Sequence, residues 1–278
     1  MDRKLTFSII FKTIFLFPFF IIFILSPIVI IIVISSFFPK GKIIASNLYE
    51  FFGWVGLKIV GINLIVTGDE NVNPDQSYVV VSNHPSTLDI FTHIHGIPLS
   101  TRFLTKAELY SIPLFGRALK VLGLPKIDRQ NAKADFGKIN ESIQKVIESN
   151  LSILVFAEGK RSNSNKLLPF KKGAAFVAKE FNLPILPVVS HNAHNLMQKG
   201  EVWFRSGTIS LEILKPIENT QELTVEELTS LCFKLIDERL LFSYSRIRNN
   251  VKNGLEIIPV TSIEDVLTVA LSEKLKSI

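Results

Sequence analysis

The chain has 278 residues, of which 47% are hydrophobic, and its formal net charge is +6. This length suits one catalytic domain with an appendage and argues against two equal domains. The charge fits an anionic lipid surface or substrate. We discount nucleic acid as a partner, because no recognised nucleic-acid-binding motif accompanies the charge. The single cysteine, Cys232, excludes an intramolecular disulfide.

An uncharged apolar stretch covers residues 13–38, and a helix needs about 20 such residues to cross a bilayer. Pro18 and Pro27 interrupt the stretch, which leaves open a kinked span, a re-entrant hairpin and an interfacial helix. A cleaved signal peptide fits less well, because the run is longer than the usual hydrophobic region and no A-x-A-like site follows it. Basic residues flank both ends, so the positive-inside rule gives no orientation. We assign residues 1–58 to a membrane anchor with an interfacial helix near residues 47–57.

Short runs rich in β-branched residues then alternate with helical patterns, which indicates an α/β fold. Strands are predicted at residues 62–67, 78–81, 101–104, 152–156, 185–189 and 208–213. Helices are predicted at 135–150, after Gly173 and at 225–240, where Thr224 and Glu227 have the spacing of a capping box.

The expected fold is a mixed, largely parallel central sheet flanked by helices, with an N-terminal hydrophobic membrane helix or helical hairpin. Residues 59–245 would form the catalytic domain, and residues 246–278 a tail of unknown role.

The first polar cluster follows a strand and reads YVVVSNHPSTLD, ending at Asp89. A helix is expected to start near Ser86, with Pro85 in its first turn. This arrangement would put His84 at the carboxyl end of a strand, where open α/β sheets carry their sites, with the Asp89 carboxylate in reach of the imidazole. Such a pair can act as a general base and its orienting group. The competing interpretation is a structural histidine beside an aspartate that the helix dipole favours.

A second cluster, FAEGKRS, also follows a strand. Arg161 could hold a phosphate through its planar fork, with Lys160 adding charge, although an internal ion pair between Glu158 and Arg161 competes with this. Lys106 follows another strand and could reach an anionic headgroup. His93 and His95 lack further ligands at metal-binding spacing, so we expect no metal site.

Four blocks together resemble the glycerolipid acyltransferase family, which includes the 1-acylglycerol-3-phosphate acyltransferases. NHPSTLD looks like the first motif of the family, KAELYSIPLFG with GLPKIDR the second, FAEGKRS the third and LPILPVV the fourth. They occur in the family's order across residues 79–189, which makes the resemblance more specific than any single block. Two departures are Ala157, where the family usually has proline, and Lys160, where it usually has threonine.

The resemblance implies direct transfer of an acyl group from acyl-CoA or an acyl-carrier protein to the sn-2 hydroxyl of 1-acyl-glycerol-3-phosphate. His84 would be the base and Asp89 would orient it. The substrate-binding residues implied by the resemblance are Lys106, Glu158, Gly159, Arg161 and Arg129. The thioester would be a co-substrate, with no further cofactor. The protein would associate with membrane lipids at the inner or cytoplasmic membrane, with its catalytic domain on the cytoplasmic side, and its oligomeric state stays open.

Two other classes of function remain as alternatives. A lipid hydrolase would use a serine nucleophile, but the G-x-S-x-G elbow is missing and Ser86 does not reproduce it. A non-enzymatic lipid-binding protein would not need His84, Asp89, Glu158 and Arg161 together. Residues 253–273 are similar to the end of the proteolytic domain of Lon-type proteases, but without a Ser and Lys site this likeness implies no proteolysis.

Overall fold

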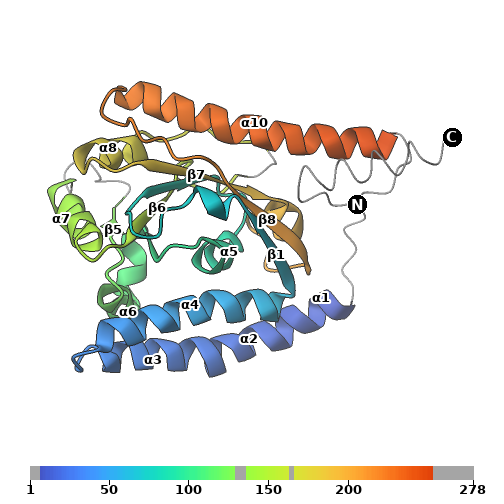
Figure 1. Ribbon diagram of the computed structural model, residues 1–278. Coiled ribbons are helices and arrows are strands. Elements are labelled where there is room, and N and C mark those ends of the chain that lie inside the picture. Colours follow the sequence, from blue (N-terminus) through green and yellow to red (C-terminus); the bar gives the residue numbers. More distant parts are fainter. Residues whose placement is uncertain (1–6, 129–135, 163–165, 253–278) are drawn as a thin grey trace. The chain divides into compact units, whose positions relative to one another are not determined.

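Figure 1 shows the computed structural model of the protein, which describes residues 7–128, 136–162 and 166–252. Contacts divide the chain into two compact units, residues 1–237 and residues 238–278. Every strand that the structure describes lies in the first unit. The domain limits expected at residues 58 and 245 stay predictions, and the segment similar to Lon-type proteases lies outside the described residues.

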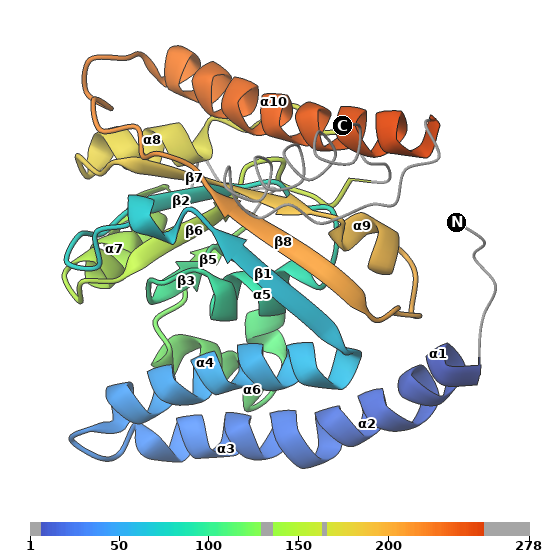
Figure 2. The same cartoon turned by 45° about the vertical axis from the view of Figure 1, so that its right-hand side comes forward.

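The first unit is built on a six-stranded sheet with the order β1-β8-β7-β2-β6-β3 (Figure 2). Neighbouring strands run parallel except β7 and β8, which are antiparallel. Each strand lies within two residues of its predicted limits, and the mixed, largely parallel sheet confirms the predicted fold class. The strands are β1 (Ile62–Thr67), β2 (Val79–Ser82), β3 (Thr101–Phe103), β6 (Ser152–Phe156), β7 (Ile185–His191) and β8 (Gly207–Ile213).

Helices cover both faces of this sheet, which is why its central strands are apolar on both sides. Helices α4 (Gly41–Val60) and α5 (Asp89–Gly96) lie on one face (Figures 1 and 2). Helix α8 (Gly173–Glu180) and the part of α10 (Val225–Lys252) in the first unit lie on the other, with Leu228 and Ile236 fully buried. Helix α7 (Phe136–Ile147) packs beside β6.

The predicted capping box at the start of α10 is confirmed. The Thr224 N–H donates to Glu227 Oε2 at 2.8 Å, and the Glu227 N–H donates to Thr224 Oγ1 at 3.2 Å. The start predicted for α5 was wrong, because this helix begins at Asp89 and not near Ser86. The Ser86 hydroxyl accepts the Leu88 N–H, and the Asp89 carboxylate accepts the Ser86 N–H. Such side-chain bonds to the backbone compete with helix formation, so Pro85 lies in a loop.

Short elements complete the first unit. Strands β4 (Thr105–Lys106) and β5 (Lys126–Ile127) form a two-residue parallel pair, which is too short to give a sequence signal. The remaining short elements are η3 (Asp69–Asn71), η4 (Ala107–Ser111), α6 (Phe115–Val121) and α9 (Ala193–Leu196).

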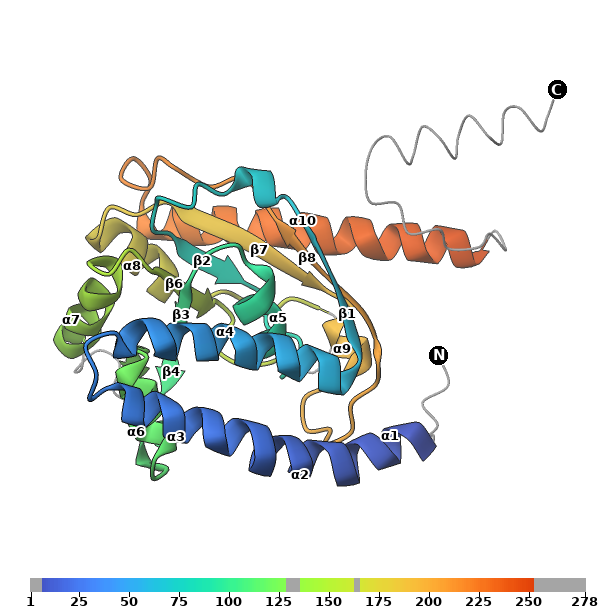
Figure 3. The same cartoon turned by 60° about the horizontal axis from the view of Figure 1, so that its bottom comes forward.

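The N-terminal residues form a helical hairpin (residues 7–60), shown from below in Figure 3. Its first arm is one helical run made of α1 (Phe7–Phe11), η1 (Lys12–Leu16), α2 (Phe17–Phe20), η2 (Ile21–Leu25) and α3 (Ser26–Ser35). The second arm is α4, which contains the interfacial helix predicted at 47–57. Both arms are long and apolar enough to cross a membrane by length and composition. The two π-helical segments precede or follow prolines, which cannot donate the backbone hydrogen bond of a regular α-helix.

Small residues let α4 approach α5 closely. A Cβ atom added to Gly56 would lie 2.2 Å from a ring carbon of Phe91, and one added to Gly53 would lie 2.7 Å from Ile94 Cγ2. The hairpin is therefore held directly against the helix whose first residue is Asp89.

Candidate active site

The loop that carries His84 leaves the carboxyl end of β2 and enters α5 at Asp89. Asn83 is the first residue of this loop, and its side chain anchors the loop to the neighbouring strand β7. The Asn83 amide donates to the Ser190 carbonyl at 3.0 Å, and the Ser190 N–H donates to Asn83 Oδ1 at 2.8 Å. This two-way bond fixes the direction in which the chain leaves the sheet.

His84 and Asp89 form the pair that the sequence predicted. His84 Nδ1 lies 2.9 Å from Asp89 Oδ2. The aspartate is fully buried, whereas the histidine side chain is 15% exposed. The carboxylate is held in turn by the Ser86 N–H at 2.8 Å and by the Ser190 hydroxyl, which donates to Oδ1 at 3.0 Å. A buried carboxylate with three donors is fixed in orientation, so it fixes the imidazole as well.

This geometry selects one tautomer of His84. A carboxylate only accepts hydrogen bonds, so the proton of the neutral ring sits on Nδ1. Nε2 is then the basic atom, and within the described residues no hydrogen bond occupies it. A partly exposed imidazole with a free Nε2 and a buried carboxylate behind it can take a proton from a bound hydroxyl.

The second loop of the site follows β6, the parallel neighbour of β2. Glu158 is 3% exposed and accepts two backbone N–H groups, from His84 at 2.8 Å and from Leu168 at 2.9 Å. Burial raises the pKa of Glu158, and the two backbone hydrogen bonds oppose that shift. The ion pair between Glu158 and Arg161 that the sequence left open is not formed, since the carboxylate is used for these backbone groups.

Arg161 is tied to the histidine loop. Its guanidinium donates to the Thr87 hydroxyl, and the next residue, Ser162, donates its N–H to the His84 carbonyl at 3.2 Å. Gly159 makes the intervening turn at φ +71°, a backbone region that favours glycine. The structure thus brings Glu158, Gly159 and Arg161 together with His84 and Asp89.

Two predicted site residues stand apart from this group. Lys106 is exposed in β4, and in the described part of the chain it shares no hydrogen bond or ion pair with the other candidates. Arg129 lies outside the described residues.

Comparison with known proteins shows to which family the chain belongs. A model of the acyltransferase family matches residues 63–191, a range that contains all four motif blocks. A 1-acyl-sn-glycerol-3-phosphate acyltransferase from Limnanthes douglasii is 33% identical over 200 residues, which cover 72% of this chain and 70% of that protein. The alpha form of this enzyme from Homo sapiens is 32% identical over 196 residues, covering 70% and 69% of the two chains.

The chain belongs to the acyltransferase family. Its fold matches the crystal structure of the 1-acyl-sn-glycerophosphate (LPA) acyltransferase PlsC from Thermotoga maritima with a TM-score of 0.68. The match covers 85% of this chain and 95% of that one at 23% identity.

This acyltransferase also surrounds its histidine with residues to which the sequence analysis gave no role. The Phe156 ring stacks on the His84 ring, with centroids 3.9 Å apart and an angle of 8° between the planes. The motif LVFAEG places an aromatic residue directly before the Glu158 loop, and this was the sequence signal from which the position of Phe156 near the site could have been inferred.

His93 is the second unpredicted residue of the acyltransferase site. It is fully buried, its Nδ1 lies 2.8 Å from the Asp89 carbonyl, and its Nε2 lies 2.8 Å from Ser82 Oγ. The carbonyl only accepts, so Nδ1 carries the proton and the Ser82 hydroxyl donates to Nε2. Burial lowers the pKa of His93 to about 4, so the ring is neutral. It joins the end of β2 to the start of α5 and thereby braces both ends of the His84 loop.

Ser86 has a structural position in this acyltransferase. Its hydroxyl is buried, donates to the Met197 carbonyl at 2.8 Å and accepts the Leu88 N–H at 3.2 Å. A hydroxyl held in this way is not directed at the histidine, which argues against its use as a hydrolase nucleophile.

Proposed function

We propose that the protein transfers a fatty acyl group from a thioester to the sn-2 hydroxyl of 1-acyl-glycerol-3-phosphate and forms phosphatidic acid. The observation that carries this proposal is the buried Asp89 carboxylate 2.9 Å from His84 Nδ1, which leaves Nε2 as a base. The names of the relatives support the choice of acceptor.

In the proposed reaction, His84 Nε2 takes the proton of the acceptor hydroxyl as its oxygen attacks the thioester carbonyl. The new ester C–O bond forms, the C–S bond breaks, and the imidazolium returns the proton to the thiolate. Asp89 stabilises the imidazolium without itself accepting the proton. The thioester is acyl-CoA or acyl-carrier protein, and no further cofactor is required.

The acceptor phosphate would be held by Arg161, with Lys106 and Arg129 contributing charge. Arg161 is well placed because its guanidinium lies on the loop that is bonded to the His84 loop at three points. Glu158 shapes this site by joining the two loops through the His84 N–H, and Gly159 shapes it by making the turn between Glu158 and Arg161. A planar guanidinium suits bidentate binding of phosphate.

We further propose that the N-terminal hairpin holds the site at the cytoplasmic membrane, with the catalytic domain on the cytoplasmic side. Both arms of the hairpin are mostly exposed apolar surface, with 24% and 33% of their most apolar windows buried. The lipid acceptor and product reside in the bilayer, whereas the thioester donors are soluble and reach the site from the cytoplasm.

The test uses purified full-length protein in detergent, with lysophosphatidate or monoacylglycerol as acceptor and acyl-CoA or acyl-carrier protein as donor. Thiol release and lipid product are both measured. His84→Ala should abolish transfer with the fold retained, and wild-type turnover in this variant would refute its role as base. Thiol release with free fatty acid as the product, at the same rate with or without lysolipid, would indicate a hydrolase.

Arg161→Ala tests the phosphate site. Loss of one charged hydrogen bond should raise the KM for lysophosphatidate about ten- to a hundred-fold, with the KM for the thioester unchanged. Lys171→Ala is the control, because Lys171 is an exposed lysine of the same polar segment and has no proposed role. Equal use of phosphate-free acceptors by the wild type would contradict the assignment.

A further inference from the structure

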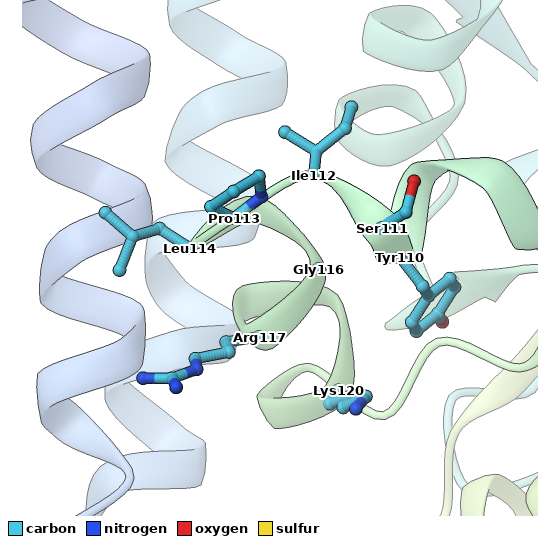
Figure 4. A pocket seen from close by; sticks show the side chains of 8 residues that line it. All are labelled: Tyr110, Ser111, Ile112, Pro113, Leu114, Gly116, Arg117 and Lys120. Carbon is cyan, nitrogen blue, oxygen red and sulfur yellow. The ribbon is translucent and has the colours of Figure 1, made fainter.

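A basic hollow lies at the end of the hairpin, between η4 and α6. Figure 4 shows this cavity of about 430 Å³, which is bordered by the side chains of Arg117 and Lys120 from α6 and by Ser111 from η4. Both basic side chains are exposed. Residues 106–127 carry four basic side chains and one acidic one, Glu108, so this segment has a local charge of +3.

Apolar side chains project beside these charges. We call Leu109, Ile112 and Leu114 the apolar tip, and they are 36%, 46% and 48% exposed. Leu114 has a φ of +61°, a backbone conformation that is unfavourable for a bulky residue. This conformation belongs to the turn that opens α6, in which the Phe115 N–H donates to the Pro113 carbonyl at 2.7 Å and the Ala118 N–H donates to the Leu114 carbonyl at 2.9 Å. The turn leaves the Leu114 side chain on the surface.

The apolar tip leads into a helix that packs against the hairpin. Helix α6 packs against α3, and Ala118, Leu119 and Leu122 share a core with Ile28 and Ile32. In Figure 4, Leu114 and Arg117 extend toward the hairpin helices, drawn in pale blue. Beyond this contact the connection between α3 and α4 exposes Phe37 at 83% and Phe38 at 59%. Two separate segments that both adjoin the packed helices α3 and α6 therefore expose apolar side chains, and one of them also carries exposed basic groups.

We propose that residues 109–120 form a second membrane contact, in which the apolar tip inserts into the bilayer and Arg117 and Lys120 bind the phosphates of anionic lipid headgroups. This arrangement of inserted apolar residues beside basic ones is the one that an anionic bilayer surface attracts. An acidic protein such as a carrier protein would match the charges but would leave the exposed tip without an apolar partner. The proposal rests on the membrane placement of the hairpin given under Proposed function.

Insertion of the tip is tested with full-length protein in phosphatidylcholine vesicles, with or without phosphatidylglycerol. Ile112→Trp, in a background where Trp54 and Trp203 are replaced by phenylalanine, reports contact with brominated lipid by fluorescence quenching. Phe176→Trp on α8 is the matched control, because both side chains are 46% exposed. We expect quenching at position 112 and not at 176. Equal quenching, or none at 112, would overturn the proposal.

The charges are tested separately. Each basic residue at an anionic surface contributes about five-fold to membrane partition, so Arg117→Gln with Lys120→Gln should lower the preference for phosphatidylglycerol vesicles roughly 30-fold. Lys138→Gln with Lys145→Gln on α7 removes the same charge from exposed positions and should leave the preference unchanged. An unchanged preference in the first variant would refute the headgroup contact.

Two further measurements separate the membrane contact from the proposed His84 mechanism and from binding of a protein partner. Transfer by the Arg117 and Lys120 variant should match the wild type on detergent-dispersed substrates, because these side chains take no part in the chemistry. A large loss in detergent would contradict the surface role while leaving the His84 mechanism intact. If acyl-carrier protein shifts the emission of Ile112→Trp and anionic lipid does not, the surface binds a protein and the membrane proposal is wrong.

Discussion

Asp89→Asn should separate the charge of the Asp89 carboxylate from its hydrogen bonds. An asparagine oxygen can replace Oδ2 and still accept from His84 Nδ1 and the Ser86 N–H, both of which are donors in the native protein. Its amide nitrogen then faces Ser190 Oγ, which can accept the new hydrogen bond. The variant therefore keeps the position of the imidazole and removes the negative charge behind it.

The size of the effect follows from the geometry. The carboxylate oxygen is 2.9 Å from His84 Nδ1, and the aspartate is fully buried while the histidine is 15% exposed. Two unit charges about 4 Å apart attract by about 4 kcal/mol at an effective dielectric constant of about 20. The imidazolium of the proposed reaction would lose this stabilisation in the variant, so kcat should fall by about 10³-fold. Asp89 is too deeply buried to touch the acceptor, so KM should change little.

The assay measures initial rates of thiol release and phosphatidate formation over a range of lysophosphatidate concentrations. Urea denaturation of the same preparation establishes that the fold is retained. Asp69→Asn is the control, since it makes the same chemical change at an exposed position in η3. A wild-type kcat in Asp89→Asn, or a fall in kcat/KM that comes from a higher KM alone, would refute the argued role of the carboxylate.

Two other buried groups give predictions about stability. Burial lowers the pKa of His93 from 6.5 to about 4, so the folded protein takes up this proton at a lower pH than the unfolded chain. The contribution of the neutral ring to the free energy of unfolding is complete above pH 6.5 and is lost as the pH falls toward 4, a change of about 3 kcal/mol. Urea titrations of the wild type at several pH values should show this loss, and those of His93→Gln should lack it. Glu158→Ala leaves the His84 and Leu168 N–H groups without an acceptor and should lower the free energy of unfolding by about 2–4 kcal/mol at pH 5, by the same titration. Because burial raises the pKa of Glu158, the deficit should shrink as the pH rises through that pKa, and a deficit that grows with pH would contradict this.

The sequence by itself determined which segments form the sheet and that His84 and Asp89 lie together at a strand end. Runs such as residues 79–81 are apolar at every position, which is typical of strands that are covered on both faces. His84 and Asp89 were predictable as a pair because they are close in sequence and a strand end precedes them. The capping box at Thr224 was predictable for the same reason, since its bonds span three residues.

Tertiary structure decided how the loops meet. The contacts of Glu158 and Ser190 with the His84 loop join residues that are more than 70 positions apart in sequence, and they depend on β6 and β7 lying on either side of β2. The local sequence pattern carries no information about the order of strands in a sheet, because a strand has the same pattern of apolar residues whichever strands lie beside it. The roles of Phe156 and His93 also depend on that order, since both side chains contact elements other than their own.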